Sequence, residues 1–337
     1  MSLPVLEVQN LHVHFQTSRG PVKAVDGVSF ALGAGERYGL IGESGSGKTT
    51  IALAIMRLIT PPGRIVKGSV LLDGVDLFGL PDEEMRQRRL ADVALVTQGA
   101  MNALNPVIRV REQIVDGLRS HGVKMSRDEV EAHIAGLLPR VGLRPEVANM
   151  YPHELSGGMK QRVSIAIAIS LRPRLIIADE PTCALDVVVQ RQVMQTLRKV
   201  QEDLGAAVIL IGHDMGLMAQ FADRMGVIYA GKLVEEGMVA PFFAAPQHPY
   251  SQLLVSSVTT LEKKGEFHGV RGAPPSLLDL PSGCAFHPRC TYAMPRCKTE
   301  APLLHTLRSG YRASCHLLEE DDRLPARDAR DEEEVKA

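Results

Sequence analysis

The sequence lacks an apolar run long enough to cross a membrane. Its longest apolar stretches, such as residues 51–56 and 164–171, are far shorter than the ~20 residues that a membrane-spanning helix requires. The first residues contain Glu7 and no basic segment followed by a long apolar one, so we expect no secretory signal. These absences predict a protein that does not cross the bilayer and that resides in the cytosol.

An excess of charge is absent as well. Lys and Arg total 38 against 39 Asp and Glu, and the formal net charge is -1 at pH 7. Broad nonspecific binding of nucleic acid needs a basic excess that neutralises phosphates, so it is not expected. Hydrophobic residues make up 45% of the chain and charged residues 23%, a balance typical of soluble globular proteins. The length predicts one main domain of roughly 200 to 250 residues and an appendage.

Hydrophobic periodicity changes along the chain. Alternation predicts strands of an antiparallel sheet over residues 5–15 and 22–32. Three-to-four spacing of apolar residues predicts a helical insertion from about residue 100 to 170. A helix is predicted over residues 49–58. Compact apolar runs predict short strands, the later ones buried and parallel as in an α/β core, over residues 38–41, 70–72, 93–96, 175–178, 208–211 and 225–229.

A phosphate-binding motif lies between a predicted strand and a predicted helix. Residues 42–49 match G-x-x-x-x-G-K-[ST] in the context that this motif needs. The glycines let backbone N–H groups converge on phosphate oxygens, Lys48 adds positive charge, and the Thr49 hydroxyl can bind Mg²⁺. The predicted phosphate-binding residues are Gly42, Glu43, Ser44, Gly45, Ser46, Gly47, Lys48, Thr49 and Thr50.

Two adjacent carboxylates follow a predicted buried strand. Asp179 and Glu180 stand at the carboxyl end of this strand, where ligands bind in open α/β sheets. By itself such a pair is more often a helix cap. Beside a phosphate loop, Asp179 suits the Mg²⁺ shell and Glu180 suits the orientation of the attacking water.

Residues 155–161 read Leu-Ser-Gly-Gly-Met-Lys-Gln and resemble the signature motif of ABC ATPases. A Ser-Gly-Gly run that opens a helix offers a second anion-binding N-terminus. In the ABC family this element reaches across a head-to-tail dimer to the γ-phosphate held by the partner's phosphate loop. The resemblance therefore implies that Ser156, Gly157 and Gly158 bind ATP on a second chain.

Four further residues stand where ABC ATPases have functional ones. Phe15 stands at the place of the aromatic that stacks on adenine, and Gln98 resembles the Q-loop glutamine that touches magnesium and water. Asp186 ends an Ala-Leu-Asp stretch that resembles the D-loop at the dimer seam, and His213 resembles the switch histidine at the γ-phosphate. Alone, these would be a core phenylalanine, a surface glutamine and a structural histidine. Their order along the chain favours the ABC interpretation.

Three positions depart from the family pattern. Gly99 follows the glutamine where an acidic residue is common, Cys183 replaces a Ser or Thr before the D-loop, and Gly212 replaces a hydroxyl residue before the histidine. None removes a group that handles phosphate, magnesium or water. Hydrolysis is still expected, and the departures bear on coupling and on the dimer seam.

The ABC resemblance covers roughly residues 5–240, and a second resemblance covers much of the remainder. Residues 248–251, 272–275 and 281–290 resemble, in order, the C-terminal extension of oligopeptide and dipeptide importer ATPases. This group also includes nickel importers. The resemblance implies a subunit of an importer.

Cysteine is scarce, yet four of the five are crowded into this extension, which indicates a metal. Four thiolates can hold a [4Fe-4S] cluster or a tetrahedral zinc ion, and their spacings fit neither the common ferredoxin nor the CxxC zinc pattern. Free buried thiols are a third possibility. Some peptide-importer ATPases carry an iron–sulfur cluster here, so the resemblance favours [4Fe-4S], with a structural role. The ligands would be Cys284, Cys290, Cys297 and Cys315.

The predicted fold class is α/β: an ABC-type P-loop nucleotide-binding domain, with a RecA-like core, an antiparallel β-subdomain and a helical subdomain, plus a small Cys-rich extension. The predicted bounds are residues 1–240 for the ABC domain, 241–318 for the extension and 319–337 for a charged, disordered tail.

The predicted function is to bind ATP and Mg²⁺ and to hydrolyse ATP, so that dimer closure powers import of dipeptides or oligopeptides. The implied partners are a second, different ATPase chain, two transmembrane permease subunits and an extracytoplasmic substrate-binding protein, with no nucleic acid. The implied location is the cytoplasmic face of the inner membrane. Alternatives are a soluble ABC ATPase of DNA repair or translation, a regulatory module with little turnover, and an importer of nickel or another small solute.

Overall fold

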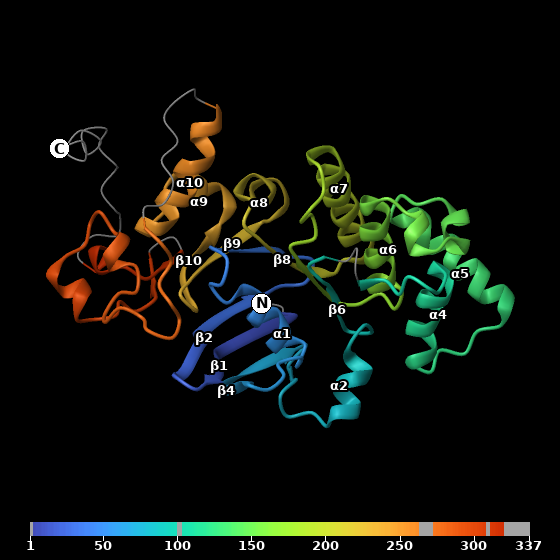
Figure 1. Ribbon diagram of the computed structural model, residues 1–337, viewed down its shortest axis with the longest axis horizontal. Coiled ribbons are helices and arrows are strands. Elements are labelled where there is room, and N and C mark those ends of the chain that lie inside the picture. Colours follow the sequence, from blue (N-terminus) through green and yellow to red (C-terminus); the bar gives the residue numbers. More distant parts are fainter. Residues whose placement is uncertain (1–2, 100–102, 263–271, 308–310, 320–337) are drawn as a thin grey trace.

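The protein contains two β-sheets flanked by helices, as Figure 1 shows for the computed structural model. The structure describes residues 3–99, 103–262, 272–307 and 311–319. The smaller sheet has four strands in the order β2-β1-β4-β5, and the larger has eight in the order β11-β12-β10-β9-β3-β8-β7-β6. The predicted tail lies outside the described residues apart from its first residue, Glu319.

The smaller sheet is antiparallel, as the alternating pattern predicts. Residues Val8, Leu11 and Val13 of its central strand are fully or almost fully buried, while His12 and His14 lie on the more exposed side. The sheet therefore covers one face of a core and leaves the other face partly exposed to water. Its strands are β1 (Leu6–Thr17), β2 (Gly20–Leu32), β4 (Gly63–Leu72) and β5 (Val75–Asp76).

The larger sheet has a parallel centre. Strands β6 (Val93–Val96), β7 (Leu175–Asp179), β8 (Ala207–Gly212), β3 (Arg37–Ile41) and β9 (Arg224–Tyr229) run parallel, as the compact apolar runs predict. All five residues of β7 are buried, because helices and the smaller sheet cover both faces. The phosphate-loop strand β3 lies between β8 and β9.

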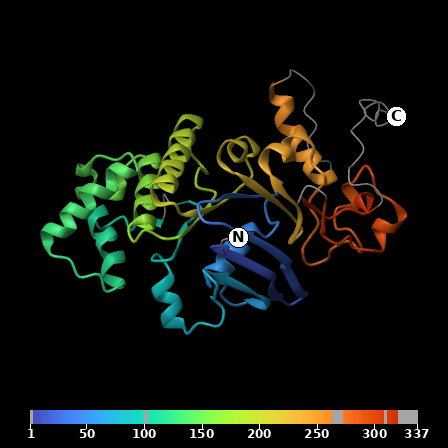
Figure 2. The same cartoon turned by 180° about the vertical axis from the view of Figure 1, so that it is seen from behind.

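Helices α4, α5 and α6 lie together at one end of the molecule, and α9 and α10 lie on the other side (Figures 1 and 2). The predicted helical insertion contains α4 (Val110–Ser120), α5 (Arg127–Arg140) and α6 (Gly157–Ile169). The predicted helix over 49–58 is shorter, because Arg57 has a φ of 49° just beyond α1 (Lys48–Ile55). The other helices are α2 (Asp82–Arg88), α7 (Val187–Leu204), α8 (Met215–Phe221), α9 (Val239–Ala244) and α10 (Pro249–Glu262).

Residues near the C-terminus complete the larger sheet. Strand β10 (Lys232–Met238) pairs antiparallel with β9, and the two-residue strands β12 (Arg312–Ala313) and β11 (His305–Thr306) follow at this edge. Phe286 and Tyr311 belong to the same buried cluster as residues of β9 and β10. The Cys-rich segment is therefore packed on the sheet that carries the phosphate loop. Among the described helices, none is both long and apolar enough for a membrane span.

Candidate nucleotide-binding site

The phosphate loop joins the buried strand β3 to helix α1. Gly47 caps the helix with a φ of 108°, and a Cβ atom there would lie 2.1 Å from the carbonyl oxygen of Ala24. Only glycine suits this position, because an L side chain is strained at that φ and would overlap backbone. The Lys48 ammonium is buried and donates hydrogen bonds of 2.8 Å to the carbonyl oxygens of Gly42 and Glu43. Burial lowers the pKa of Lys48, which the carboxylates of Glu180 and Asp179 oppose.

A hollow of about 500 Å³ opens over this loop. Its wall combines the phosphate loop with residues that stand far away in the sequence and that follow three other strands of the larger sheet. This is where ligands bind in open α/β sheets. The lining residues are Ala24, Ser44, Gly45, Gly47, Lys48, Thr49, Thr50, Gln98, Glu180 and His213.

The first carboxylate, Asp179, is buried beside the loop with 4% of the residue exposed. Burial raises its pKa, while a hydrogen bond with Thr49 and the charge of Lys48 oppose the rise. Its Oδ1 atom is buried and has no hydrogen-bond partner. A carboxylate oxygen without a donor, next to a threonine hydroxyl, is suited to bind a hard cation such as Mg²⁺.

The second carboxylate, Glu180, faces two of the predicted residues. Gln98 Nε2 donates a hydrogen bond of 2.7 Å to its Oε2, and His213 Nδ1 lies 3.4 Å from its Oε1. The backbone φ of Glu180 is 44°, which is uncommon for a residue other than glycine and recurs at functional sites. The structure thus brings Gln98, Glu180 and His213 together at the edge of the hollow.

The predicted signature and D-loop residues lie elsewhere. Ser156 caps α6 and accepts a hydrogen bond from the Met159 N–H, and Asp186 caps α7 through the Val189 N–H. Neither residue is among those that line the hollow. Within one chain, the predicted signature serine therefore lies outside the hollow over the phosphate loop.

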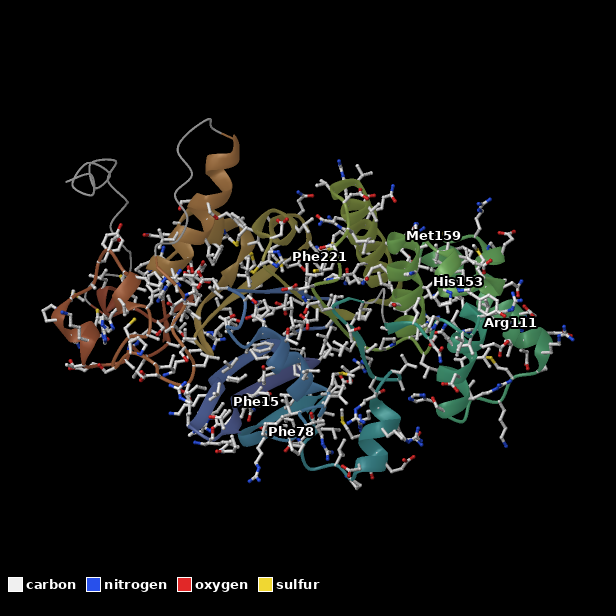
Figure 3. All side chains as sticks on the ribbon, viewed as in Figure 1. Phe15, Phe78, Arg111, His153, Met159 and Phe221 are labelled. Carbon is white, nitrogen blue, oxygen red and sulfur yellow. The ribbon has the colours of Figure 1, made fainter. Side chains whose placement is uncertain are left out.

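Phe15 also lies outside the lining residues. It is on β1 in the smaller sheet, whereas Met159 marks the helical end of the molecule (Figure 3). A Cβ atom built at Gly63 would lie 2.7 Å from the Phe15 ring, so this ring packs closely against β4. Stacking of Phe15 on adenine stays a prediction.

The four cysteines of the C-terminal segment lie near one another. Burial raises the pKa of Cys290 to about 11 and that of Cys315 to about 12, and the neighbouring cysteines add to both shifts. The Cys284 N–H donates a hydrogen bond of 2.9 Å to the Cys297 carbonyl, which joins the two ends of the segment 284–297. No three of the four sulfur atoms lie within 4.8 Å of one another.

Sequence reasoning missed two partners of the phosphate loop. Arg289 forms an ion pair with Glu43, and the Tyr250 hydroxyl accepts a hydrogen bond from the Glu43 N–H. Both residues belong to segments that the sequence marks as part of the extension. A spacing pattern cannot show a contact between residues that stand 246 positions apart.

Two models of known protein families match this chain. A family model described as "ABC transporter" matches residues 25–183, and one described as "Oligopeptide/dipeptide transporter, C-terminal region" matches residues 234–297. The dipeptide transport ATP-binding protein DppD of Haemophilus influenzae is 43% identical over 319 residues, which are 93% of this chain and 96% of that protein. The chain belongs to the ABC transporter family of ATP-binding proteins. The prediction of an ABC-type ATPase is confirmed.

Other members of the family are similarly close to this ABC protein. DppD of Escherichia coli is 41% identical over 93% of this chain and 97% of its own length. The oligopeptide transport ATP-binding protein AppD of Bacillus subtilis is 40% identical over 94% and 98%. Among solved structures, a dimer of the ATP-binding cassette MJ0796 with ADP and Pi has a TM-score of 0.62 and 28% identity, over 69% of this chain and 98% of that one. The P-loop fold with mixed α/β sheets is thereby confirmed.

Proposed function

We propose that this chain is the ATP-hydrolysing subunit that powers an ABC importer of dipeptides or oligopeptides. The hydrolytic half of this proposal rests on the convergence of Lys48, Thr49, Gln98, Glu180 and His213 at one hollow. The peptide half rests on relatives at 40–43% identity that are named for dipeptide or oligopeptide transport. Those names favour this function over a soluble ABC ATPase of DNA repair or translation, and over an importer of nickel.

Each residue at the hollow has a role in phosphoryl transfer. Lys48 and the loop N–H groups would hold the β- and γ-phosphates, and Thr49 with Asp179 would hold Mg²⁺, which neutralises charge on the phosphates when bound. Glu180 would accept a hydrogen bond from the attacking water, with Gln98 and His213 fixing the orientation of its carboxylate through the contacts at 2.7 and 3.4 Å. The side chain of His213 is 70% exposed, so a γ-phosphate bound in the hollow would also reach it.

A second chain would complete the site. Ser156, Gly157 and Gly158 are remote from their own phosphate loop, and the similar cassette MJ0796 has a dimeric structure. Exposed Val187 and Val188, at 79% and 68%, follow Asp186 directly and are suited to burial in such a dimer. In our proposal two cassettes close over two ATP molecules, and the partner is a second, different ATPase chain.

The importer would include further components. The peptide-transport family implies two transmembrane permease subunits, an extracytoplasmic substrate-binding protein, and a peripheral position on the cytoplasmic face of the inner membrane. We assign residues 1–240 to the ABC domain and 241–318 to the extension that the second family model overlaps.

A substitution that removes the charge but keeps the size of the side chain tests the hydrolytic role. Glu180→Gln keeps the size of the side chain but removes its basicity, so the rate of phosphate release in the assembled transporter should fall about 10²–10⁴-fold while ATP stays bound. Glu202→Gln, which makes the same change on exposed α7, is the matched control. Unchanged hydrolysis in Glu180→Gln would refute the role, and uptake of nickel but not of labelled dipeptide into proteoliposomes would refute the cargo.

We also propose that Cys284, Cys290, Cys297 and Cys315 hold a [4Fe-4S] cluster. Four neighbouring thiols in one loop-rich segment fit this group. A tetrahedral zinc ion, with Zn–S bonds near 2.3 Å, would bring adjacent sulfurs to about 3.8 Å, whereas no three of these four sulfurs lie within 4.8 Å of one another. When bound, the cluster would cross-link a segment that has little regular secondary structure.

Metal analysis tests this second proposal. Anaerobically purified protein should be brown and contain iron and acid-labile sulfide, and Cys297→Ser should lose both. Cys183→Ser is the matched control, because this cysteine is exposed and outside the group. Stoichiometric zinc without iron would refute the cluster.

A further inference from the structure

The C-terminal segment is bonded directly to the phosphate loop at Glu43. Both guanidinium NH₂ groups of Arg289 donate to the Glu43 carboxylate, at 2.7 and 2.8 Å, in a parallel two-bond arrangement. Next to this pair, the Tyr250 hydroxyl accepts the Glu43 N–H at 2.9 Å. Two side chains from outside the nucleotide-binding core therefore occupy both the side chain and the backbone of one phosphate-loop residue.

The pair is shielded from water. Only 6% of the Arg289 side chain and 23% of the Glu43 side chain are exposed. Arg289 also contacts the Tyr229 hydroxyl at 3.3 Å and lies over the Tyr229 ring. The charge-assisted hydrogen bonds of a bidentate arginine–carboxylate pair are stronger than neutral ones and fix its geometry, and leaving one shielded partner unpaired is costly.

Glu43 connects this contact to the predicted phosphate-binding lysine, Lys48. Its carbonyl oxygen accepts a hydrogen bond of 2.8 Å from Lys48 Nζ and one of 3.2 Å from the Ser46 N–H. Any turn of the Glu43 peptide would therefore move an acceptor of Lys48. Arg289 bonds to the side chain of the same residue and Tyr250 to its N–H, so both contacts would resist such a turn.

Arg289 also compensates the negative charge of Glu43. An acidic residue within a loop that must bind a triphosphate repels it, because like charges disfavour each other in a partly desolvated site. The guanidinium of Arg289 neutralises that carboxylate. The ring of Phe286 packs against Tyr229 and Tyr250 at 5.2 and 5.5 Å, and this packing holds the turn that presents Arg289.

We propose that Arg289 and Tyr250 are positioning residues for ATP, which hold the phosphate loop in its binding shape and cancel the charge of Glu43. The C-terminal segment then tunes nucleotide affinity as well as completing the sheet. This inference rests on the proposed function, since it assumes that the loop binds ATP. It predicts an effect on the Kd and KM for ATP and little effect on kcat.

Two measurements test this inference. Titration of the full chain with a fluorescent ATP analogue gives the Kd, and ATP hydrolysis by the assembled transporter gives the KM and kcat. Arg289→Ala should raise the Kd and the KM at least about tenfold, as expected for loss of charge-assisted hydrogen bonds, with kcat within about threefold. Arg289→Ala combined with Glu43→Gln should recover part of the affinity, because no unpaired charge remains although the two hydrogen bonds are still missing. Arg289→Lys should be intermediate, since lysine keeps the charge without the fork.

Arg296→Ala is the matched control, because this arginine of the same segment pairs with exposed Glu300 and Glu319. If Arg289→Ala fails to fold, Arg289→Lys and Tyr250→Phe provide the test, and each must raise the Kd at an unchanged melting temperature. Affinity in Arg289→Ala equal to that of Arg296→Ala would overturn the inference, as would a double variant that binds no better than Arg289→Ala. Failure of the unsubstituted chain to bind ATP would overturn the proposed function and this inference with it.

Discussion

Two glycines of the phosphate loop separate backbone strain from steric overlap. Gly45 and Gly47 have φ values of 76° and 108°, so alanine at either position adopts a left-handed backbone that costs about 1–2 kcal/mol. At Gly45 the added methyl group would meet no atom within 4 Å. At Gly47 it would lie 2.1 Å from the carbonyl oxygen of Ala24 and 3.7 Å from the Cα of Gly231.

The overlap at Gly47 cannot be relieved by a rotamer change. The contacted atoms are backbone atoms, so either β2 or the loop itself must move. Overpacking of this kind adds about 1–3 kcal/mol, which gives a total of about 2–5 kcal/mol for Gly47→Ala against about 1–2 kcal/mol for Gly45→Ala. The difference between the two variants isolates the contact between the loop and Ala24.

Urea unfolding of the nucleotide-free protein measures this difference. Unfolding is monitored by far-UV circular dichroism, because the chain has no tryptophan for fluorescence. Gly136→Ala provides a control for the substitution itself, since Gly136 lies in α5 with open space around it. It should be neutral or stabilise the protein by up to about 1 kcal/mol. Equal losses in Gly45→Ala and Gly47→Ala, or a larger loss at Gly45, would refute the steric argument.

Two other predictions concern stability away from the hollow. Burial raises the pKa of Glu235 to about 7, although hydrogen bonds from the Gln247 and His248 N–H groups and from Tyr311 oppose the rise. The folded protein therefore holds the Glu235 proton more tightly than the unfolded chain does. This contribution to stability is fully present below the ordinary pKa of 4.5 and is lost as the pH rises to about 7. The free energy of unfolding, relative to Glu235→Gln, should fall by up to about 3 kcal/mol between pH 4.5 and 7.5, and a difference that rises with pH would contradict this. Asp186→Ala removes the cap of α7 and should cost about 1 kcal/mol in urea unfolding, whereas Asp203→Ala near the end of α7 should cost less.

Local patterns predicted most of the elements, and together with the family resemblance they named every residue that lines the hollow except Ala24. A parallel strand buried on both faces must be apolar throughout, so the runs at β3, β7, β8 and β9 were recognisable. The phosphate loop was recognisable because its glycines, lysine and threonine act together within eight residues. Asp179 and Glu180 followed from their place at the end of β7. The strands β11 and β12 were not predicted, because two residues each are too few to show any periodicity.

The sequence by itself thus determined the ABC fold, the phosphate loop and the pair of carboxylates, because each depends on residues that are close in the chain and on the periodicity of apolar residues. Only the tertiary structure decided which distant residues come into contact. Gln98 and His213 contact Glu180, and Arg289 and Tyr250 contact Glu43. The tertiary structure also placed the signature serine, Ser156, away from its own phosphate loop. Such contacts join positions far apart in the sequence, and the packing of strands and side chains sets them, which no local pattern encodes.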